Sequence, residues 1–186
     1  MDAKTRTQFE NLESKEKQTQ YDAFTYIMEV SKVKVDWAYE VWDRLLEDLE
    51  HKDPHRGSRA AQFLVHLAIS DPDERILGDF SKIWAVTKDP KFVTARHSLQ
   101  AIWRIGLAGK KQKDLIMKHF ESRFLFCIDE KNYTLTRLDI IEGLSKLYIE
   151  RQEEDIKEKA QELIENVSEE KYKKKYSKLL KGMKDS

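Results

Sequence analysis

The chain has 186 residues, of which 40% are apolar and 10% aromatic, so it is long enough and apolar enough to form the core of one domain. Its 34 basic and 34 acidic residues balance, which argues against a global electrostatic attraction to nucleic acid or an anionic membrane. Only 6 glycines and 3 prolines accompany 37% charged residues, a composition that disfavours a many-stranded sheet and favours an all-α protein.

The first residues are strongly charged and lack the apolar core of a secretory signal. The longest apolar stretches, from Phe63 to Ile69 and from Phe124 to Ile128, are too short to span a bilayer. We therefore expect a soluble, cytoplasmic protein with no membrane partner. The single cysteine, Cys127, lies within the second stretch and is expected to be a buried thiol rather than a reactive one.

The prolines of the chain are regularly spaced. The three prolines occupy positions 54, 72 and 90, at intervals of 18 residues, and each follows an aspartate. Aspartate is a favoured N-cap because its carboxylate accepts from unpaired N–H groups of the first helical turn, and proline suits the next position. Each Asp-Pro pair therefore predicts a helix start, and two such units make a repeat of about 36 residues, typical of helix-pair solenoids.

The segment Asp71-Pro72-Asp73-Glu74 strengthens this pattern, because Glu74 lies three residues after Asp71 in the spacing of a capping box. It predicts a helix that begins at Asp73. Thr136 and Asp139 have the same spacing and predict another helix start, and we interpret Asn132 as a further helix-start residue.

Apolar periodicity between these marks gives the expected helices in chain order. They cover residues 21–33, 37–52, 58–69, 73–86, 92–106, 111–128, 136–151, 154–167 and 168–181. We divide the single domain, residues 1–186, into an N-terminal cap over 1–35, three helix pairs over 36–150 and a C-terminal helix pair over 151–186. Asp36 is expected to cap the second of these helices.

Two of the helix starts share a longer pattern. An Asp-Pro turn is followed by an arginine early in the helix, Arg59 or Arg96, and then by small and aliphatic residues, ending near Gly106 in the second case. A degraded third copy begins at Asp129, contains Arg137 and lacks the proline.

This pattern resembles the second helix of a HEAT repeat, and the resemblance covers roughly residues 36–150. It implies a right-handed α-α superhelix, here a short solenoid of about four helix pairs with an N-terminal capping helix, in which the second helices line a concave face. The alternative architecture is a plain helical bundle.

No catalytic signature is present, since the chain has no Gly-x-Ser-x-Gly elbow, no zinc helix, no calcium loop and no paired cysteines. His51 and His55 have a spacing that suits a metal, but Pro54 lies between them and interrupts the helix that would be needed. Glu153, Glu154 and Asp155 are expected to form a solvated acidic first turn. We predict no catalytic residues, no metal and no cofactor.

Two further features have a structural and a functional interpretation. The four tryptophans are expected to pack in the core, with Trp103 as the exception to watch because it flanks an apolar stripe beside Arg104. Residues 171 to 184 hold seven lysines and no acidic residue, whereas 151 to 170 hold eight acidic and three basic residues. We interpret the lysines as a solvated terminal helix, and phosphate binding as the alternative.

The resemblance indicates a non-enzymatic protein-interaction or scaffold module that binds another protein on its concave face. The polar sides of the second helices supply the predicted partner-binding residues: Arg59, Gln62, His66, Arg96, Gln100, Arg104, Glu142 and Lys146. The alternative is a nucleic-acid-binding protein related to the HEAT-like alkylpurine DNA glycosylases. The chain departs from that pattern, because it has no adjacent tryptophan pair followed by aspartate and no excess of positive charge.

Overall fold

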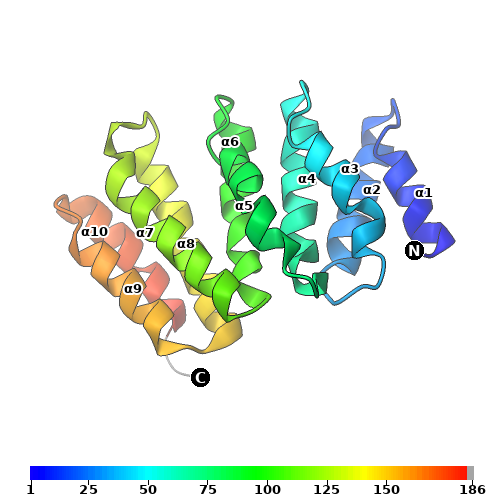
Figure 1. The fold of residues 1–186 in the computed structure, drawn as a ribbon. Coiled ribbons are helices and arrows are strands. Elements are labelled where there is room, and N and C mark those ends of the chain that lie inside the picture. The colour runs from blue at the N-terminus through cyan, green and yellow to red at the C-terminus, as the bar shows by residue number, and fades with distance from the viewer. Residues whose placement is uncertain (184–186) are drawn as a thin grey trace. The chain divides into compact units, whose positions relative to one another are not determined.

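The computed structural model describes residues 1–183, and every regular element in that range is a helix (Figure 1). Lys184 of the predicted lysine cluster lies outside the described residues. Contacts group the chain into two compact units, residues 1–95 and 96–186, where the sequence predicted one domain. The boundary falls within helix α6 (Phe92–Ala101), so its first turn belongs to unit 1 and the remainder to unit 2.

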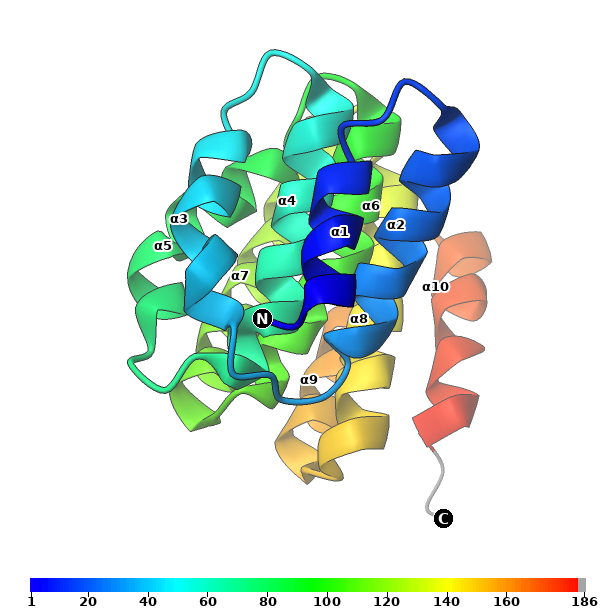
Figure 2. The ribbon, with the colours of Figure 1, turned by 90° about the vertical axis from the view of Figure 1, so that its right-hand side faces the viewer.

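Unit 1 consists of helices that pack on their neighbours along the chain, as α1 and α2 do in Figure 2 and α3 and α4 do in Figure 1. Besides the start of α6, its elements are α1 (Ala3–Asn11), α2 (Lys17–Val30), α3 (Ala38–Asp48), α4 (Pro54–Leu67), the 3-10 turn η1 (Ala68–Ser70) and α5 (Arg75–Val86).

The core of unit 1 is rich in aromatic side chains that the helix periodicity directs inward. Trp42 of α3 is fully buried, and Phe63 of α4 is 1% exposed. Phe63 meets the ring of Phe9 from α1 in an edge-to-face contact, with ring centroids 5.9 Å apart. Such aromatic pairs contribute about 1 kcal/mol of stability beyond that from the apolar area that they bury. This contact attaches the N-terminal helix to the first helix pair.

Three predicted features of unit 1 need correction. The cap contains two helices rather than one, because Asp2 caps a short α1 by accepting from the Thr5 amide at 2.8 Å. Asp36 is not a cap, since the N-cap of α3 is Trp37. The capping box at residues 71–74 is also wrong, because Glu74 itself adopts a left-handed conformation, with φ of 54°, and α5 begins after it.

One Asp-Pro pair opens a helix as predicted, whereas α5 begins three residues after Pro72 and α6 begins two residues after Pro90. Asp53 is the N-cap of α4, with Pro54 as the first helical residue, and its carboxylate accepts from the amide of His55 at 3.0 Å. At the start of α5 the carboxylate of Asp71 accepts from the amide of Ile76 at 2.7 Å, across a longer turn than predicted. Both aspartates satisfy a first-turn N–H group, as the spacing predicted.

Unit 2 follows the same sequential packing, with α9 beside α10 and α7 beside α9 in Figure 1. After the remainder of α6, its elements are the 3-10 turn η2 (Ile102–Leu107), α7 (Lys110–Phe126), the 3-10 turn η3 (Cys127–Asp129), α8 (Tyr133–Arg151), α9 (Glu154–Glu165), α10 (Glu170–Ser177) and the 3-10 turn η4 (Leu179–Met183).

Helix α8 is the centre of unit 2, because η2, α7, α9 and η4 all pack on it. Its inward side chains include Ile140, Ile141 and Leu144, each fully buried. The prediction of a helix start at Thr136 is wrong: α8 begins one turn earlier, after Asn132, and Thr136 is buried within it. Asn132 is the N-cap, as expected from its position.

The all-α fold with helices packed on their sequence neighbours is confirmed, while the right-handed superhelix and the concave face stay predictions. Cys127 is 2% exposed and Trp37, Trp42 and Trp84 are 9% exposed or less, so their predicted burial is confirmed. Trp103, named as the exception, is buried as well, at 8% exposure. Within residues 1–183, none of the helices combines the length and the apolar character needed to cross a bilayer.

Two helical glycines test this packing in opposite directions. A Cβ atom at Gly143 of α8 would lie 2.9 Å from the Phe120 ring, whereas one at Gly78 of α5 would meet nothing within 4 Å. We expect Gly143→Ala to lower the free energy of unfolding by about 1 to 3 kcal/mol despite its better helix propensity. Gly78→Ala should raise it by up to about 1 kcal/mol.

Urea unfolding followed by circular dichroism measures both glycine variants. Equal stabilisation by the two substitutions would show that α8 does not pack closely on α7 at Gly143.

Candidate functional site

The predicted partner-binding residues of unit 1 lie on α4 in three different environments. Gln62 is half-buried and donates to the carbonyl oxygen of Ser58 at 3.1 Å within the helix. Arg59 lines a hollow beside Phe9 of α1 and is also only half-exposed. His66 is 5% exposed, and its Nδ1 lies 3.4 Å from the hydroxyl of Ser31 at the end of α2. The expectation that His66 lies on an open face is therefore wrong.

In unit 2 the predicted residues Arg96 and Gln100 of α6 converge on one buried carboxylate. Asp139 of α8 is 1% exposed and accepts from Arg96 Nε at 2.8 Å and Nη2 at 3.1 Å. Gln100 Nε2 donates to the same carboxylate at 2.9 Å. Bidentate pairing of this kind is the strongest geometry for an arginine and a carboxylate.

This hydrogen bond to Asp139 raises the pKa of the Arg96 guanidinium above its ordinary value, although burial acts in the opposite direction. The cluster therefore holds a buried negative charge inside unit 2. Its first role is structural, because it joins α6 to α8.

Glu142 and Lys146 form an ion pair one turn apart on the exposed side of α8, with 2.8 Å between Oε1 and Nζ. The charge of Glu142 also contributes, as the smallest effect, to the raised pKa of Arg96. Both side chains are about 40% exposed, at 38% and 42%. Because such pairs are weak in water, either side chain is free to exchange its partner.

Arg104 of η2 differs from the other predicted cations of unit 2. It is half-buried, and its buried Nε has no hydrogen-bond acceptor among residues 1–183. Burial lowers the pKa of its guanidinium, and the charge of Glu150 offsets only part of that effect. The guanidinium lies over the ring of Trp103, 5.6 Å from the centroid. We name Arg96, Gln100, Arg104, Glu142 and Lys146 the unit 2 polar face.

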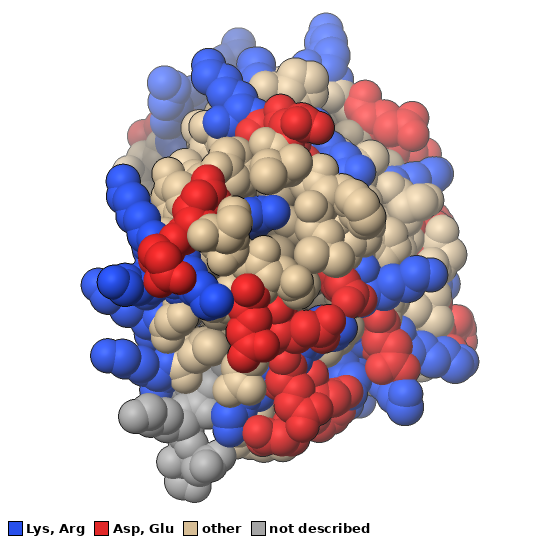
Figure 3. Space-filling view, turned by 90° about the vertical axis from the view of Figure 1, so that its left-hand side faces the viewer, with Lys and Arg blue, Asp and Glu red and all other residues tan. Residues whose placement is uncertain are grey.

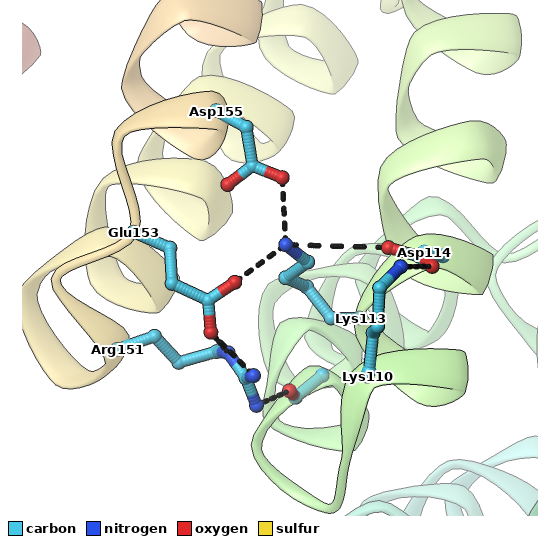
Figure 4. Close-up of polar contacts among 7 residues, drawn as sticks. Lys110, Lys113, Asp114, Arg151, Glu153 and Asp155 are labelled. Carbon is cyan, nitrogen blue, oxygen red and sulfur yellow. Dashed lines mark hydrogen bonds and ion pairs between the residues drawn. The ribbon is translucent and has the colours of Figure 1, made fainter.

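A second polar cluster lies where α7 meets the turn between α8 and α9 (Figure 4). The ammonium group of Lys113, a side chain 5% exposed, donates to Glu153 Oε2 at 2.5 Å and to Asp155 Oδ2 at 2.6 Å. Glu153 also accepts from Arg151 Nε at 2.6 Å, and Arg151 Nη1 donates to the carbonyl oxygen of Gly106 at 3.0 Å. The cluster joins α7, α8, α9 and η2.

The acidic residues at the start of α9 are thus not simply a solvated first turn, as the sequence predicted, because Glu153 and Asp155 bind the buried Lys113. Lys113 lowers the pKa of Glu153, while burial has a smaller opposite effect. Burial acts to lower the pKa of Lys113, but its hydrogen bonds to Asp155 and Glu153 outweigh it, so the pKa is raised.

The groups with nucleophilic potential are held in unreactive forms. Lys113 with a raised pKa keeps its proton, so its amine is not available for attack. Burial raises the pKa of the Cys127 thiol, which disfavours the reactive thiolate. Burial and a hydrogen bond to Asp71 raise the pKa of Tyr39 to about 12. Among residues 1–183, no three His, Cys, Asp or Glu side chains gather as a metal site requires.

No protein-family model matches this chain, and no curated protein sequence matches it either. The resemblance to HEAT repeats therefore rests on the residues quoted above and stays a prediction.

Sequence reasoning missed Lys113 and the role of Asp139. A usable signal for Asp139 exists, because it is a charged residue directly before the buried Ile140 and Ile141, where only a paired carboxylate is tolerated. Lys113 gives no such signal, since it belongs to the charged run from Lys110 to Asp114.

The Lys113 cluster predicts a pH dependence of stability. Because the folded-state pKa of Glu153 is below its ordinary value of 4.5, its contribution is present above that pH and is lost as the pH falls through the folded-state pKa. The free energies of unfolding of the wild type and of Glu153→Gln should therefore differ at pH 7 and converge as the pH falls below the folded-state pKa of Glu153. A difference that persists unchanged in acid would contradict the ion-pair assignment.

The two arginines of the unit 2 polar face should differ in their effect on stability. Arg96→Met leaves the buried carboxylate of Asp139 without its cation and should cost about 3 kcal/mol. Arg104→Met removes a cation that has no carboxylate partner and should change stability by less than about 1 kcal/mol, with stabilisation favoured. Thermal and urea unfolding measure both, and an equal loss would show that Arg104 has a structural partner.

Proposed function

We propose that the chain is a non-enzymatic, HEAT-like interaction module that binds another protein through the unit 2 polar face. The proposal is supported mainly by Arg104, which is partly buried and whose buried Nε has no hydrogen-bond acceptor within residues 1–183. Arg96 is bound to Asp139 and Lys146 to Glu142, but Arg104 has neither an ion pair nor a hydrogen bond through its side chain within residues 1–183.

Partial burial of a cation that forms no ion pair costs free energy, and an acidic group from outside the chain would offset that cost. A carboxylate from a partner fits best, because the guanidinium presents paired N–H donors in a fixed plane. Arginine is also enriched among the residues that dominate binding energy at interfaces. Trp103 beneath Arg104 holds the side chain close to one position, which lowers the entropy lost on binding.

The surroundings of Arg104 support a protein rather than a small molecule as the ligand. Gln100 donates to Asp139, and the Glu142–Lys146 pair is exposed; both would supply polar groups to the rim of an interface if they lie beside Arg104, as the HEAT-like arrangement predicts. The raised pKa values of Lys113 and Cys127 make these two side chains poor candidates for a nucleophile. The cytoplasmic location expected from the sequence stays a prediction.

The glycosylase-like alternative gains no support from the tryptophans. All four tryptophans are 9% exposed or less, so none presents a ring on which a base would stack.

The test compares two charge reversals in quantitative affinity capture from an extract of the source cells. Arg104→Glu should reduce recovery of a specific partner by at least about tenfold, as expected for an interface anchor worth more than 1.4 kcal/mol. Lys118→Glu, at an exposed position of α7 in the same unit, changes the net charge equally and should leave recovery unchanged. Circular dichroism checks that both variants are folded.

The result that contradicts the proposal is equal recovery with Arg104→Glu and the wild type, or an equal loss with the two variants. Arg96 is unsuitable for this test, because its removal also exposes the buried charge of Asp139.

A further inference from the structure

Helix α10 has two sides of different character. Its inner side carries Tyr176, which is fully buried and donates from its hydroxyl to the carbonyl oxygen of Thr134 at 2.9 Å. Tyr172 is half-buried and stacks on Tyr176, with ring centroids 6.3 Å apart. These two rings attach α10 to the rest of unit 2, so its outer side has a defined orientation.

The outer side of α10 carries Lys171, Lys174 and Lys175, and Lys178 follows at the C-cap of the helix. All four are exposed and follow the spacing i, i+3, i+4, i+7, which places them on one side of a helix. We name these four residues the lysine stripe. It extends for about 10 Å along the helix axis. Figure 3 shows basic side chains along the edge that α10 forms, beside a more acidic area.

Within residues 1–183 the four lysines of the stripe have no carboxylate partner, in contrast to several other lysines of unit 2. Ion pairs bind several lysines elsewhere in the unit: Lys110, Lys113, Lys146, Lys157 and Lys159. No member of the lysine stripe forms an ion pair within residues 1–183, although exposed glutamates such as Glu158 and Glu165 lie on the neighbouring α9.

Helix stability explains only part of this pattern. Lys174 and Lys175 lie in the last turn of α10, where a cation interacts favourably with the helix dipole. Lys171 lies in the first turn, where the dipole disfavours a cation. Four like charges within about 10 Å also repel one another. A polyanion bound along the stripe would relieve that repulsion.

We propose that the lysine stripe binds the phosphate backbone of a nucleic-acid duplex without reading its sequence. Lysine contacts phosphate as a point charge, and several like charges along one side of a helix suit a strand that carries a phosphate charge at every step. This surface is separate from the unit 2 polar face, so the inference goes beyond the proposed protein binding.

The other polyanions fit the stripe less well. Proteins that bind single strands usually offer exposed aromatic rings for base stacking, whereas Tyr176 is buried and Tyr172 is covered by it on one side. A helix that lies on a membrane needs an apolar side toward the lipid, and the aromatic side of α10 faces the protein.

The experiment measures fluorescence anisotropy of a labelled DNA duplex of about two helical turns, at several salt concentrations. For the full chain, the logarithm of the association constant should fall with the logarithm of the salt concentration, with a slope of about −3 to −4 if all four lysines contact phosphates. Lys174→Gln/Lys175→Gln should make the slope shallower by about 2 and weaken binding by at least about tenfold at low salt.

The matched control is Lys118→Gln/Lys131→Gln, which removes two exposed lysines of the same unit outside α10. It should leave both the slope and the affinity close to those of the wild type. Circular dichroism checks that the two double variants are folded equally well.

Three outcomes would overturn the proposal. The first is no binding of the duplex at low salt, and the second is an equal loss with the control variant, which would indicate a general effect of net charge. The third is tighter binding to the single strand, to polyglutamate or to vesicles containing phosphatidylserine than to the duplex, which would assign the stripe to that other polyanion.

Discussion

The helices within residues 1–183 bury their apolar side chains against helices that lie near them in the sequence. Few glycines and prolines and many charged residues favour long amphipathic helices. A single amphipathic helix cannot bury its apolar side chains without neighbouring helices. In unit 2 this constraint places α8 at the centre, with Ile140, Ile141 and Leu144 fully buried. Polar residues are then left with two positions, a junction between helices or the open side.

Charged groups at the junctions have partners. Asp139 is bound by Arg96 and Gln100 where α6 meets α8, and Lys113 is bound by Glu153 and Asp155 where α7 meets the turn before α9. Burial at these positions makes an unpaired charge costly, so the ion pairs fix how the helices align. The same ion pairs make Asp139 and Lys113 poor candidates for reactive residues.

Charged side chains on the solvent-exposed side of the helices indicate function when they form no ion pair within residues 1–183. Arg104 is partly desolvated without a counter-charge, and the lysine stripe concentrates positive charge on one side of α10. The first suits a single carboxylate and the second suits a row of phosphates. Both ligands would complete charges that the fold leaves uncompensated.

The parts of the structure that depend on local chemistry were predictable from the sequence. Pro54 with Asp53 marked the start of α4, and the apolar periodicity located Trp42 and Ile140 in the core. Asp71 failed as a simple cap because Glu74 adopts a left-handed conformation, which no sequence pattern indicates. The partners of Arg96 and Lys113 lie about 40 residues away along the chain, so only the tertiary structure reveals them.

Arg96 and Arg104 differ in one respect: Arg96 forms an ion pair with Asp139, whereas Arg104 forms no ion pair within residues 1–183. A pair of double-mutant cycles tests this difference, one for Arg96 with Asp139 and one for Arg104 with Glu150, the acidic residue whose charge acts on it. We expect a coupling free energy of about 2 kcal/mol or more for Arg96 with Asp139 and close to zero for Arg104 with Glu150. Coupling of equal size in the two pairs would contradict this expectation, because Arg104 would then have a partner of its own in unit 2.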